Sequence, residues 1–520
     1  MAIAAPALED RPAEKGAMLF GGYTALAESA WMGSVQATDV LESLRAAPAA
    51  TPRKVVIPRL PKLRLAGLYT RELSIPEASF VLMASFFLSA LLGAVRQVLF
   101  NAQFGAGLEA SAYYAAFRLP DTLFSLIAGG ALSSAMIPVL LSAVKQGGNE
   151  SARRLVSLVL TSLVAVFALV VLLGEILAPA FVNGLLAPGF TPQQSELTIR
   201  LTRVMLVQPL VLAVGSVATA VLNGRNQFIP TALSVLGHNL ALIAGILAAQ
   251  AYPGLGILGP TYGVIGGAVL QTIILLPGIA GEAAGIRPVW DPGDRQLREI
   301  VRLLIPNGLS VSVNYAGFIV DTAFASKAAQ IAGLPALYNA WLLVGLPIAL
   351  LGQAIGQAAF PRLADHAASE RWQELRQTLL RSLGVAIGLA LPAVLALLVL
   401  GRWVIRVLFE HGRFEAAAGD LTYQVLSIYA LALPAYVTTE LVSRGLIALR
   451  DTRTPLFTNI LQLGGRIGLM AVFIGRLDVL AVPAAFAISA ALETGILTVV
   501  LLYKLRRRLQ LPQAMARGEA

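Results

Sequence analysis

The sequence predicts an all-α polytopic membrane protein with about 12 transmembrane helices in two six-helix lobes, and three observations support this class. Of the 520 residues, 57% are hydrophobic and 13% are charged, against about 25% charged residues in soluble domains. Apolar segments of about 20 residues, long enough to cross a hydrocarbon core of roughly 30 Å, recur along the chain. The second half also repeats landmarks of the first half, which is typical of transporters.

Twelve apolar regions are expected to span the membrane. In order, they lie near residues 78–100, 110–144, 155–182, 198–222, 229–250, 255–280, 300–326, 335–361, 378–400, 421–447, 456–475 and 479–503. The first six form an N-lobe at residues 77–286, and the other six form a C-lobe at residues 287–508. Because an even number of spans leaves both lobes in the same orientation, we expect a pseudo-twofold axis along the membrane normal to relate them.

The clearest internal match joins residues 220–230 and 445–455, which align without a gap at an offset of 225 residues (445 − 220). Both segments run from an apolar helix end into a polar turn and a proline. Tyr114 and Tyr338 keep nearly the same offset. The two halves are therefore expected to share one plan, with a substrate site at the interface between them.

Loop charges predict the orientation, since Lys and Arg near span ends stay on the cytoplasmic side. The connections at 101–109, 183–197 and 251–254 contain no Lys or Arg, whereas the alternate connections contain arginines, so both termini are expected in the cytoplasm. The exception is 401–420, where mixed charges indicate a folded, salt-bridged external loop rather than a miscounted span. The formal charge of +10 follows from this topology, so no nucleic-acid partner is expected.

Both ends of the chain differ from the apolar part. Residues 1–76 are expected to be a disordered cytoplasmic tail, because Gly, Glu and Ser interrupt their longest apolar stretch, and residues 509–520 form a second cytoplasmic tail. The chain has no cysteine and only three scattered histidines, so neither a disulfide nor a metal site is expected. The sequence contains no Walker loop, dinucleotide fingerprint or nucleophile elbow, which indicates a protein that is not an enzyme and needs no cofactor.

Ionisable residues inside the spans mark candidate functional sites, because a charge in hydrocarbon costs several kcal/mol unless it faces a partner or a wet cavity. Arg96 lies deep in the first span with no acid within a helical turn, so we expect it to face a cavity. Arg118 and Asp121 lie three residues apart on the second span, where they either neutralise each other or contact the substrate.

The other intramembrane charges lie on later spans. Three basic residues are close enough to span ends that we expect them to extend toward the interface: Lys327, Arg444 and Arg466. Three acids are candidates for binding a coupling ion: Asp321, Glu440 and Glu493.

Several short motifs stand out along the apolar part of the chain. They are residues 93–100 (GAVRQVLF), 112–121 (AYYAAFRLPD), 130–138 (GALSSAMIP), 222–230 (LNGRNQFIP), 321–326 (DTAFAS), 408–414 (LFEHGRF) and 451–455 (DTRTP). They occur in the order found in the MurJ/MviN lipid II flippases, and the chain resembles that family. The resemblance implies the multidrug/oligosaccharidyl-lipid/polysaccharide exporter fold, with two six-helix lobes around a central cavity. It also implies export of an undecaprenyl-pyrophosphate-linked cell-wall precursor by alternating access.

The resemblance further implies a headgroup site. Arginines line the family's cavity and suit a pyrophosphate, since guanidinium pairs with phosphate in bidentate fashion. Arg96 matches one of these arginines, and we expect Arg118, next to Asp121, to assist it. The chain departs from the family pattern at Gln97, where an acid is usual, and at residues 338–341, which read Tyr-Asn-Ala-Trp in place of Tyr-Ala-Asp-Arg.

Three function classes follow. The first is a flippase for lipid II or another polyprenyl-linked glycan in the bacterial cytoplasmic membrane, driven by a coupling ion or the membrane potential and associated with cell-wall synthesis proteins. The second is an ion-coupled small-molecule or drug antiporter of the same superfamily, which would use the buried acids. The third is a non-transporting envelope scaffold, which the missing arginines would suit.

Overall fold

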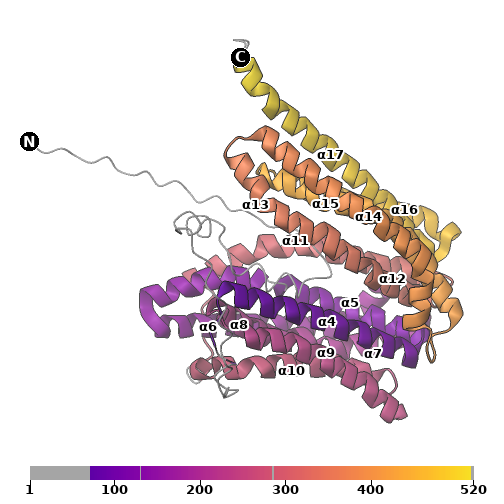
Figure 1. Cartoon of the computed structure of the whole chain (residues 1–520). Helices are drawn as coiled ribbons and strands as arrows, with labels where there is room; N and C mark the ends of the chain where they lie inside the picture. Colours follow the sequence, from indigo (N-terminus) through magenta and orange to yellow (C-terminus); the bar gives the residue numbers. More distant parts are fainter. Residues whose placement is uncertain (1–68, 70, 129–130, 284–285, 517–520) are drawn as a thin grey trace, which may run out of the picture.

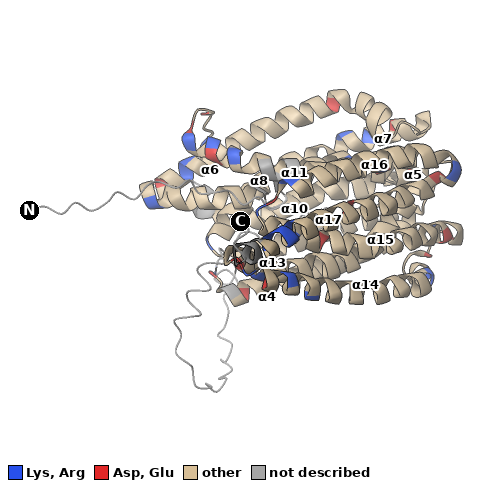
Figure 2. Cartoon of the chain, turned by 90° about the horizontal axis from the view of Figure 1, so that it is seen from above, with Lys and Arg blue, Asp and Glu red and all other residues tan. Residues whose placement is uncertain are grey.

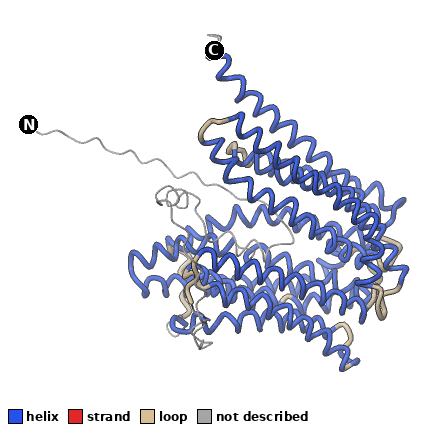
Figure 3. Tube along the Cα trace, in the orientation of Figure 1, coloured by secondary structure: helices blue, strands red, loops and turns tan. Residues whose placement is uncertain are grey.

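The computed structural model describes residue 69 and residues 71–128, 131–283 and 286–516, apart from some side chains within these ranges. This described part is almost entirely helical and contains no strand (Figure 3). The predicted all-α class is therefore confirmed. The predicted tail at 1–76 lies mostly outside the described residues, as do the last four residues of the C-terminal tail.

The N-lobe is built around α9, which packs along α10 and α4, while α6 packs against α8. Its elements are α4 (Ile75–Phe104), α5 (Leu108–Ala128), α6 (Ala131–Phe181), η1 (Val182–Leu186), α7 (Pro192–Met205), α8 (Val207–Gly224), α9 (Phe228–Ala251), η2 (Pro253–Leu255) and α10 (Leu258–Ala283). The long α6 is two helices in sequence, because Gly147 and Gly148 have non-helical backbone angles that turn the chain.

The C-lobe is built around α15, which packs against α12, α14 and α17. Its elements are α11 (Arg295–Ser326), α12 (Gly333–Pro347), η3 (Ile348–Ala354), α13 (Ile355–Ala368), α14 (Trp372–Phe409), α15 (Ala416–Ala448), α16 (Arg453–Leu477), η4 (Asp478–Leu480) and α17 (Ala481–Ala516). The π-helix η3 directly follows Pro347, where the missing backbone N–H interrupts the regular helical hydrogen bonds.

Nine helical segments of the described part are long and apolar enough to cross a membrane. Two of them join neighbouring predicted spans: Leu132–Leu186 includes the turn in α6, and Arg453–Gln510 includes both α16 and α17. Figure 2 shows charged residues gathered toward the helix ends, with few along the middle of the bundle. A multi-pass membrane protein is therefore confirmed, and the helices are consistent with the twelve predicted spans, whose number stays a prediction.

Figure 1 shows the N-lobe helices in purple and magenta and the C-lobe helices in orange and yellow. The two groups approach each other at the end where α7 and α12 lie and diverge toward the end with the turn of α6. The connections at the converging end are those that the loop charges predict to be external. Helix α11 lies between the groups and packs against α5 and α6 on one side and α16 on the other.

The segment 401–420 differs from the expected external loop. Helix α14 continues to Phe409 and α15 begins at Ala416, so most of the segment is helical. The expected salt bridges are present: Arg402 contacts Glu410 at 2.5 Å and Asp420 at 2.7 Å. These ion pairs join the ends of the two helices, which explains why arginines are compatible with this connection.

Helices α9 and α10 approach each other through glycines. A Cβ atom added to Gly245 would lie 2.6 Å from the carbonyl oxygen of Gly259 and 2.8 Å from the Cα of Gly263. Such distances are far inside van der Waals contact, so only glycine permits this approach. Small residues serve this purpose in membrane bundles, where close backbone packing replaces the hydrophobic driving force.

Candidate functional site

A buried network of amide and phenol groups joins the two lobes at the converging end. Gln97 Nε2 of α4 donates to Asn339 Oδ1 of α12 at 2.7 Å, and Asn101 Nδ2 donates to the same oxygen at 3.0 Å. Gln97 Nε2 also lies 2.6 Å from Tyr114 Oη of α5, whose ring stacks on Tyr338 at 4.3 Å. We call Gln97, Asn101, Tyr114 and Asn339 the amide latch; none of them is more than 3% exposed.

Further contacts between the lobes lie at the same end. Ser111 Oγ donates to the backbone oxygen of Ile331 at 2.8 Å, and the backbone N–H of Gly189 donates to Ser326 Oγ at 3.0 Å. The backbone N–H of Arg413 donates to Ala102 oxygen at 2.8 Å. The structure therefore has its lobes closed at the predicted external end.

Arg118 projects from α5 of the N-lobe into the C-lobe. Its Nε lies 3.3 Å from Thr322 Oγ1 of α11, and its guanidinium carbon lies 5.2 Å from the ring centre of Phe318 and 5.6 Å from that of Tyr338. Asp121 is half-buried one turn away, close enough for the charge of Arg118 to act on it. Mutual neutralisation of Arg118 and Asp121 and contact of Arg118 with the substrate therefore both stay predictions.

Arg96 is half-buried on α4 and has an amide partner rather than an acid. Its Nη1 lies 3.4 Å from Asn239 Oδ1 of α9, and Asn239 Nδ2 in turn donates to Ser89 Oγ at 3.0 Å. Among the described side chains, Arg96 forms no ion pair. Arg96 and Arg118 both lie close enough to Asp121 to interact with it electrostatically, so the three predicted headgroup residues lie in one region of the N-lobe.

Asp321 and Arg466 form a buried ion pair between α11 and α16. Arg466 is only 6% exposed, and its guanidinium carbon lies 4.8 Å from the ring centre of Phe486. The expectation that Arg466 extends to the membrane interface is therefore wrong. The sequence did not indicate this pair, because its two members lie 145 residues apart.

Glu440 and Glu493 line a cavity of about 70 Å³ inside the C-lobe, where polar side chains such as Asn459, Gln462 and Arg466 lie among apolar and aromatic ones. Glu440 Oε2 lies 3.7 Å from Arg444 Nη2 on the same helix, and Glu493 Oε1 accepts a hydrogen bond from Thr458 at 3.4 Å. Arg444 thus has an acidic partner instead of extending freely to the interface. The cavity has room for a few water molecules.

A sequence profile of the family "Lipid II flippase MurJ" matches residues 100–516, which is most of the chain. The chain belongs to the MurJ lipid II flippase family. It is 29% identical over 376 residues to a probable lipid II flippase MurJ of Rhizobium tropici, covering 71% of this chain and 70% of that protein.

Solved structures agree on the fold of this MurJ-family chain. A lipid II flippase MurJ in an inward closed conformation has a TM-score of 0.70 at 22% identity, covering 81% of this chain and 87% of that one. An inward-facing multidrug resistance MATE transporter of the MOP superfamily also has a TM-score of 0.70, at 14% identity, covering 81% and 96%. The exporter fold expected from the sequence is thus confirmed.

The structure separates the predicted site residues of this family member into two groups. Arg96, Arg118 and Asp121 lie together in the N-lobe, whereas Glu440 and Glu493 share the C-lobe cavity. Asp321 belongs to neither group, because it forms an ion pair with Arg466. No local sequence pattern indicates that Asn101 and Asn339 meet, although the departures from the family pattern at Gln97 and at residues 338–341 lie on the two helices that this network joins.

Proposed function

We propose that this protein exports lipid II or a closely related polyprenyl-linked glycan across the bacterial cytoplasmic membrane, with both termini in the cytoplasm. The observation that carries the proposal is that Arg96, half-buried in the N-lobe, contacts the amide oxygen of Asn239 and forms no ion pair among the described side chains. A guanidinium in a low-dielectric site that has no acidic partner attracts an anion. Membership in the MurJ family supports a pyrophosphate-linked lipid as that anion.

Arg96 and Arg118 would act at different stages. Arg96 can receive a phosphate without breaking an ion pair, so we assign it the first contact with the headgroup. Arg118 is covered by Phe318 and held by Thr322 of the other lobe in this state. Its guanidinium becomes available when the lobes separate at the external end, which gives the headgroup a second cation in the outward-open state.

The amide latch accounts for alternating access in this proposal. The lobes are closed at the predicted external end, so the substrate enters from the cytoplasmic side. Opening the external end requires the latch hydrogen bonds between α4 and α12 to break. Each such bond contributes only about 0.5–1.5 kcal/mol net. Substrate binding can therefore supply the free-energy difference between the closed state and the state open at the external end.

A coupling ion is the proposed driving force, with Glu440 and Glu493 as its ligands in the C-lobe cavity. Both carboxylates line one cavity, where Glu493 accepts a hydrogen bond from Thr458 and Glu440 lies 3.7 Å from Arg444, whereas Asp321 is paired directly with Arg466. The same cavity favours the second candidate function, an ion-coupled antiporter of small molecules. The fold shared with a MATE transporter is compatible with that alternative.

Complementation tests the proposal. A bacterium depleted of its own lipid II flippase should grow when it expresses this protein, and Arg96→Ala should abolish growth while the protein still accumulates in the membrane. Arg96→Lys should recover little activity, because an ammonium cannot pair with phosphate in bidentate fashion. Arg295→Ala removes an exposed arginine and is the matched control. Normal growth with Arg96→Ala would refute the headgroup assignment and favour the antiporter.

A further inference from the structure

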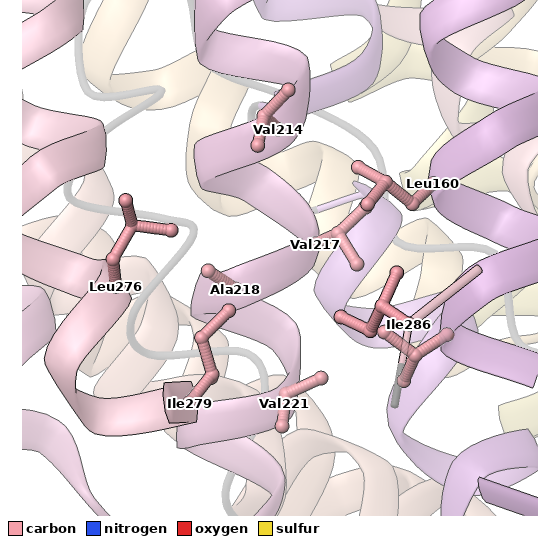
Figure 4. Close-up of a pocket in the computed structure, with 9 residues that line it drawn as sticks. Leu160, Val214, Val217, Ala218, Val221, Leu276, Ile279 and Ile286 are labelled. Carbon is pink, nitrogen blue, oxygen red and sulfur yellow. The ribbon is translucent and has the colours of Figure 1, made fainter. Parts of the chain in front are cut away.

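An apolar cavity of about 250 Å³ opens in the N-lobe, away from the charged residues of the headgroup site (Figure 4). Nine aliphatic side chains line it, and they come from α6, α8, α10 and the residue Ile286 that follows α10. Figure 4 shows Val214, Val217 and Val221 on one helix facing Leu276 and Ile279 on the next. A cavity with only apolar walls stays free of water and binds apolar groups, as an engineered cavity of about 150 Å³ binds benzene.

The cavity lies at the end of the lobe that the loop charges predict to be cytoplasmic. Val221 is three residues before the end of α8 at Gly224, and Ile279 is four residues before the end of α10 at Ala283. Val156 follows the turn at Gly148 by two helical turns. A hydrocarbon chain in this cavity would therefore come from the cytoplasmic leaflet, with its polar headgroup near these helix ends.

Two arginines that lie close in sequence to lining residues have no acidic partner among the described side chains. Arg287 directly follows the lining residue Ile286, and its backbone N–H donates to Ser157 Oγ of α6 at 3.3 Å. Arg153 precedes Val156 by three residues on α6, which places it on the same helix face. Both arginine side chains are exposed.

The neighbouring Arg154 has different surroundings. Its Nη2 atom lies 3.7 Å from Asp291 Oδ2 and 3.9 Å from Asp294 Oδ2, so these two acids form ion pairs with Arg154. Arg153 and Arg287 therefore remain available for an anionic group near the lining residues Val156 and Ile286. Guanidinium groups suit phosphate because they donate two parallel hydrogen bonds.

We propose that this cavity binds one acyl chain of an anionic phospholipid of the cytoplasmic leaflet, whose phosphate contacts Arg153 and Arg287. The apolar walls select a hydrocarbon chain, and the two arginines select a negatively charged headgroup. Basic pockets between transmembrane helices bind anionic lipids in this way. The proposal uses the membrane orientation proposed above, but it is independent of transport.

Lipid binding to the purified full-length protein tests this site. Phosphatidylglycerol or phosphatidylcholine is added to the protein in detergent, and bound lipid is measured by native mass spectrometry and by the shift in unfolding temperature. We expect phosphatidylglycerol to bind at least tenfold more tightly. The double variant Arg153→Gln/Arg287→Gln should lose this preference.

A matched control removes the same charge from the other lobe. Arg376 and Arg381 of α14 are exposed, and the double variant Arg376→Gln/Arg381→Gln should keep the preference for phosphatidylglycerol. Ala218→Leu or Val214→Leu narrows the cavity and should weaken binding of both lipids, with retained helical content confirming that the variants fold. Because this assay measures lipid binding to the purified protein and not transport, failure of this proposal is distinguishable from failure of the transport proposal.

Three results would overturn the assignment. The first is equal binding of phosphatidylcholine, which would show that the two arginines select no headgroup. The second is an equal loss of preference in the Arg376/Arg381 control, which would indicate general surface charge. The third is displacement of phosphatidylglycerol by an equal concentration of undecaprenyl phosphate, which would assign the cavity to the tail of a polyprenyl lipid.

Discussion

Replacing Asn339 by leucine should open the external end of the protein. The Asn339 side-chain oxygen accepts hydrogen bonds from Gln97 at 2.7 Å and Asn101 at 3.0 Å, and leucine removes this acceptor at nearly constant volume. Two hydrogen bonds at about 0.5–1.5 kcal/mol each sum to about 1–3 kcal/mol. At 1.4 kcal/mol per tenfold, the closed state should lose about 5- to 140-fold in population relative to the open state.

Cysteine labelling measures this shift, because the chain has no native cysteine. Ser111 is 1% exposed and contacts Ile331 of the other lobe, so a cysteine at position 111 reacts with an impermeant maleimide only when the external end opens. Labelling of Ser111→Cys should be faster in the Asn339→Leu background than without it.

The control for this experiment is another buried amide. Asn223 is 5% exposed and accepts a hydrogen bond from Thr231 within the N-lobe, so Asn223→Leu should leave the labelling rate unchanged. If folded Asn339→Leu protein labels no faster than its parent, the latch does not hold the external end closed and the reasoning fails.

Three further predictions concern stability and topology. Arg466→Ala should lower the free energy of unfolding by about 3–5 kcal/mol, because it leaves Asp321 charged and buried, whereas Asp321→Leu/Arg466→Met should recover much of the loss in thermal denaturation. Burial opposes ionisation of Asp451 in the α15–α16 connection, but hydrogen bonds from Lys504 and Thr454 outweigh it and hold the pKa below the usual 3.8. The Asp451–Lys504 ion pair should therefore stabilise the protein at neutral pH, and this contribution should be lost as the pH falls below that value. Asp451→Asn should make the free energy of unfolding depend less on pH in this acid range. An unchanged pH dependence would contradict the prediction. Finally, cysteines at Gly107 or Gln193 should react with an impermeant maleimide on intact cells, and cysteines at Gly147 or Gln296 only after permeabilisation. Reversed labelling would overturn the orientation and the proposed direction of transport.

The candidate site was predictable only in part. Arg96 was expected to face a cavity because its own helix places no acid within a turn of it; the structure gives it an amide partner in Asn239, and the cavity-facing role stays a prediction. Arg118 was open between two roles, and its contact with Thr322 of the other lobe was decided by the packing of α5 against α11. The prediction that Arg466 extends to the membrane interface was wrong for the same reason. Its burial depends on Asp321 of α11, a partner that only the packing of α11 against α16 brings close.

The all-α class, the approximate positions of the apolar segments and the charged residues within them can be read from the amino-acid sequence alone. These properties are local, since about 20 consecutive apolar residues suffice to define a span. The tertiary structure alone decided which polar groups meet. Gln97 and Asn339 are 242 residues apart, and Asp321 and Arg466 are 145 residues apart, so no local pattern records either contact. Their pairing follows from the way two separately predictable lobes pack, because a buried polar group is stable only when another element brings a partner within hydrogen-bonding distance.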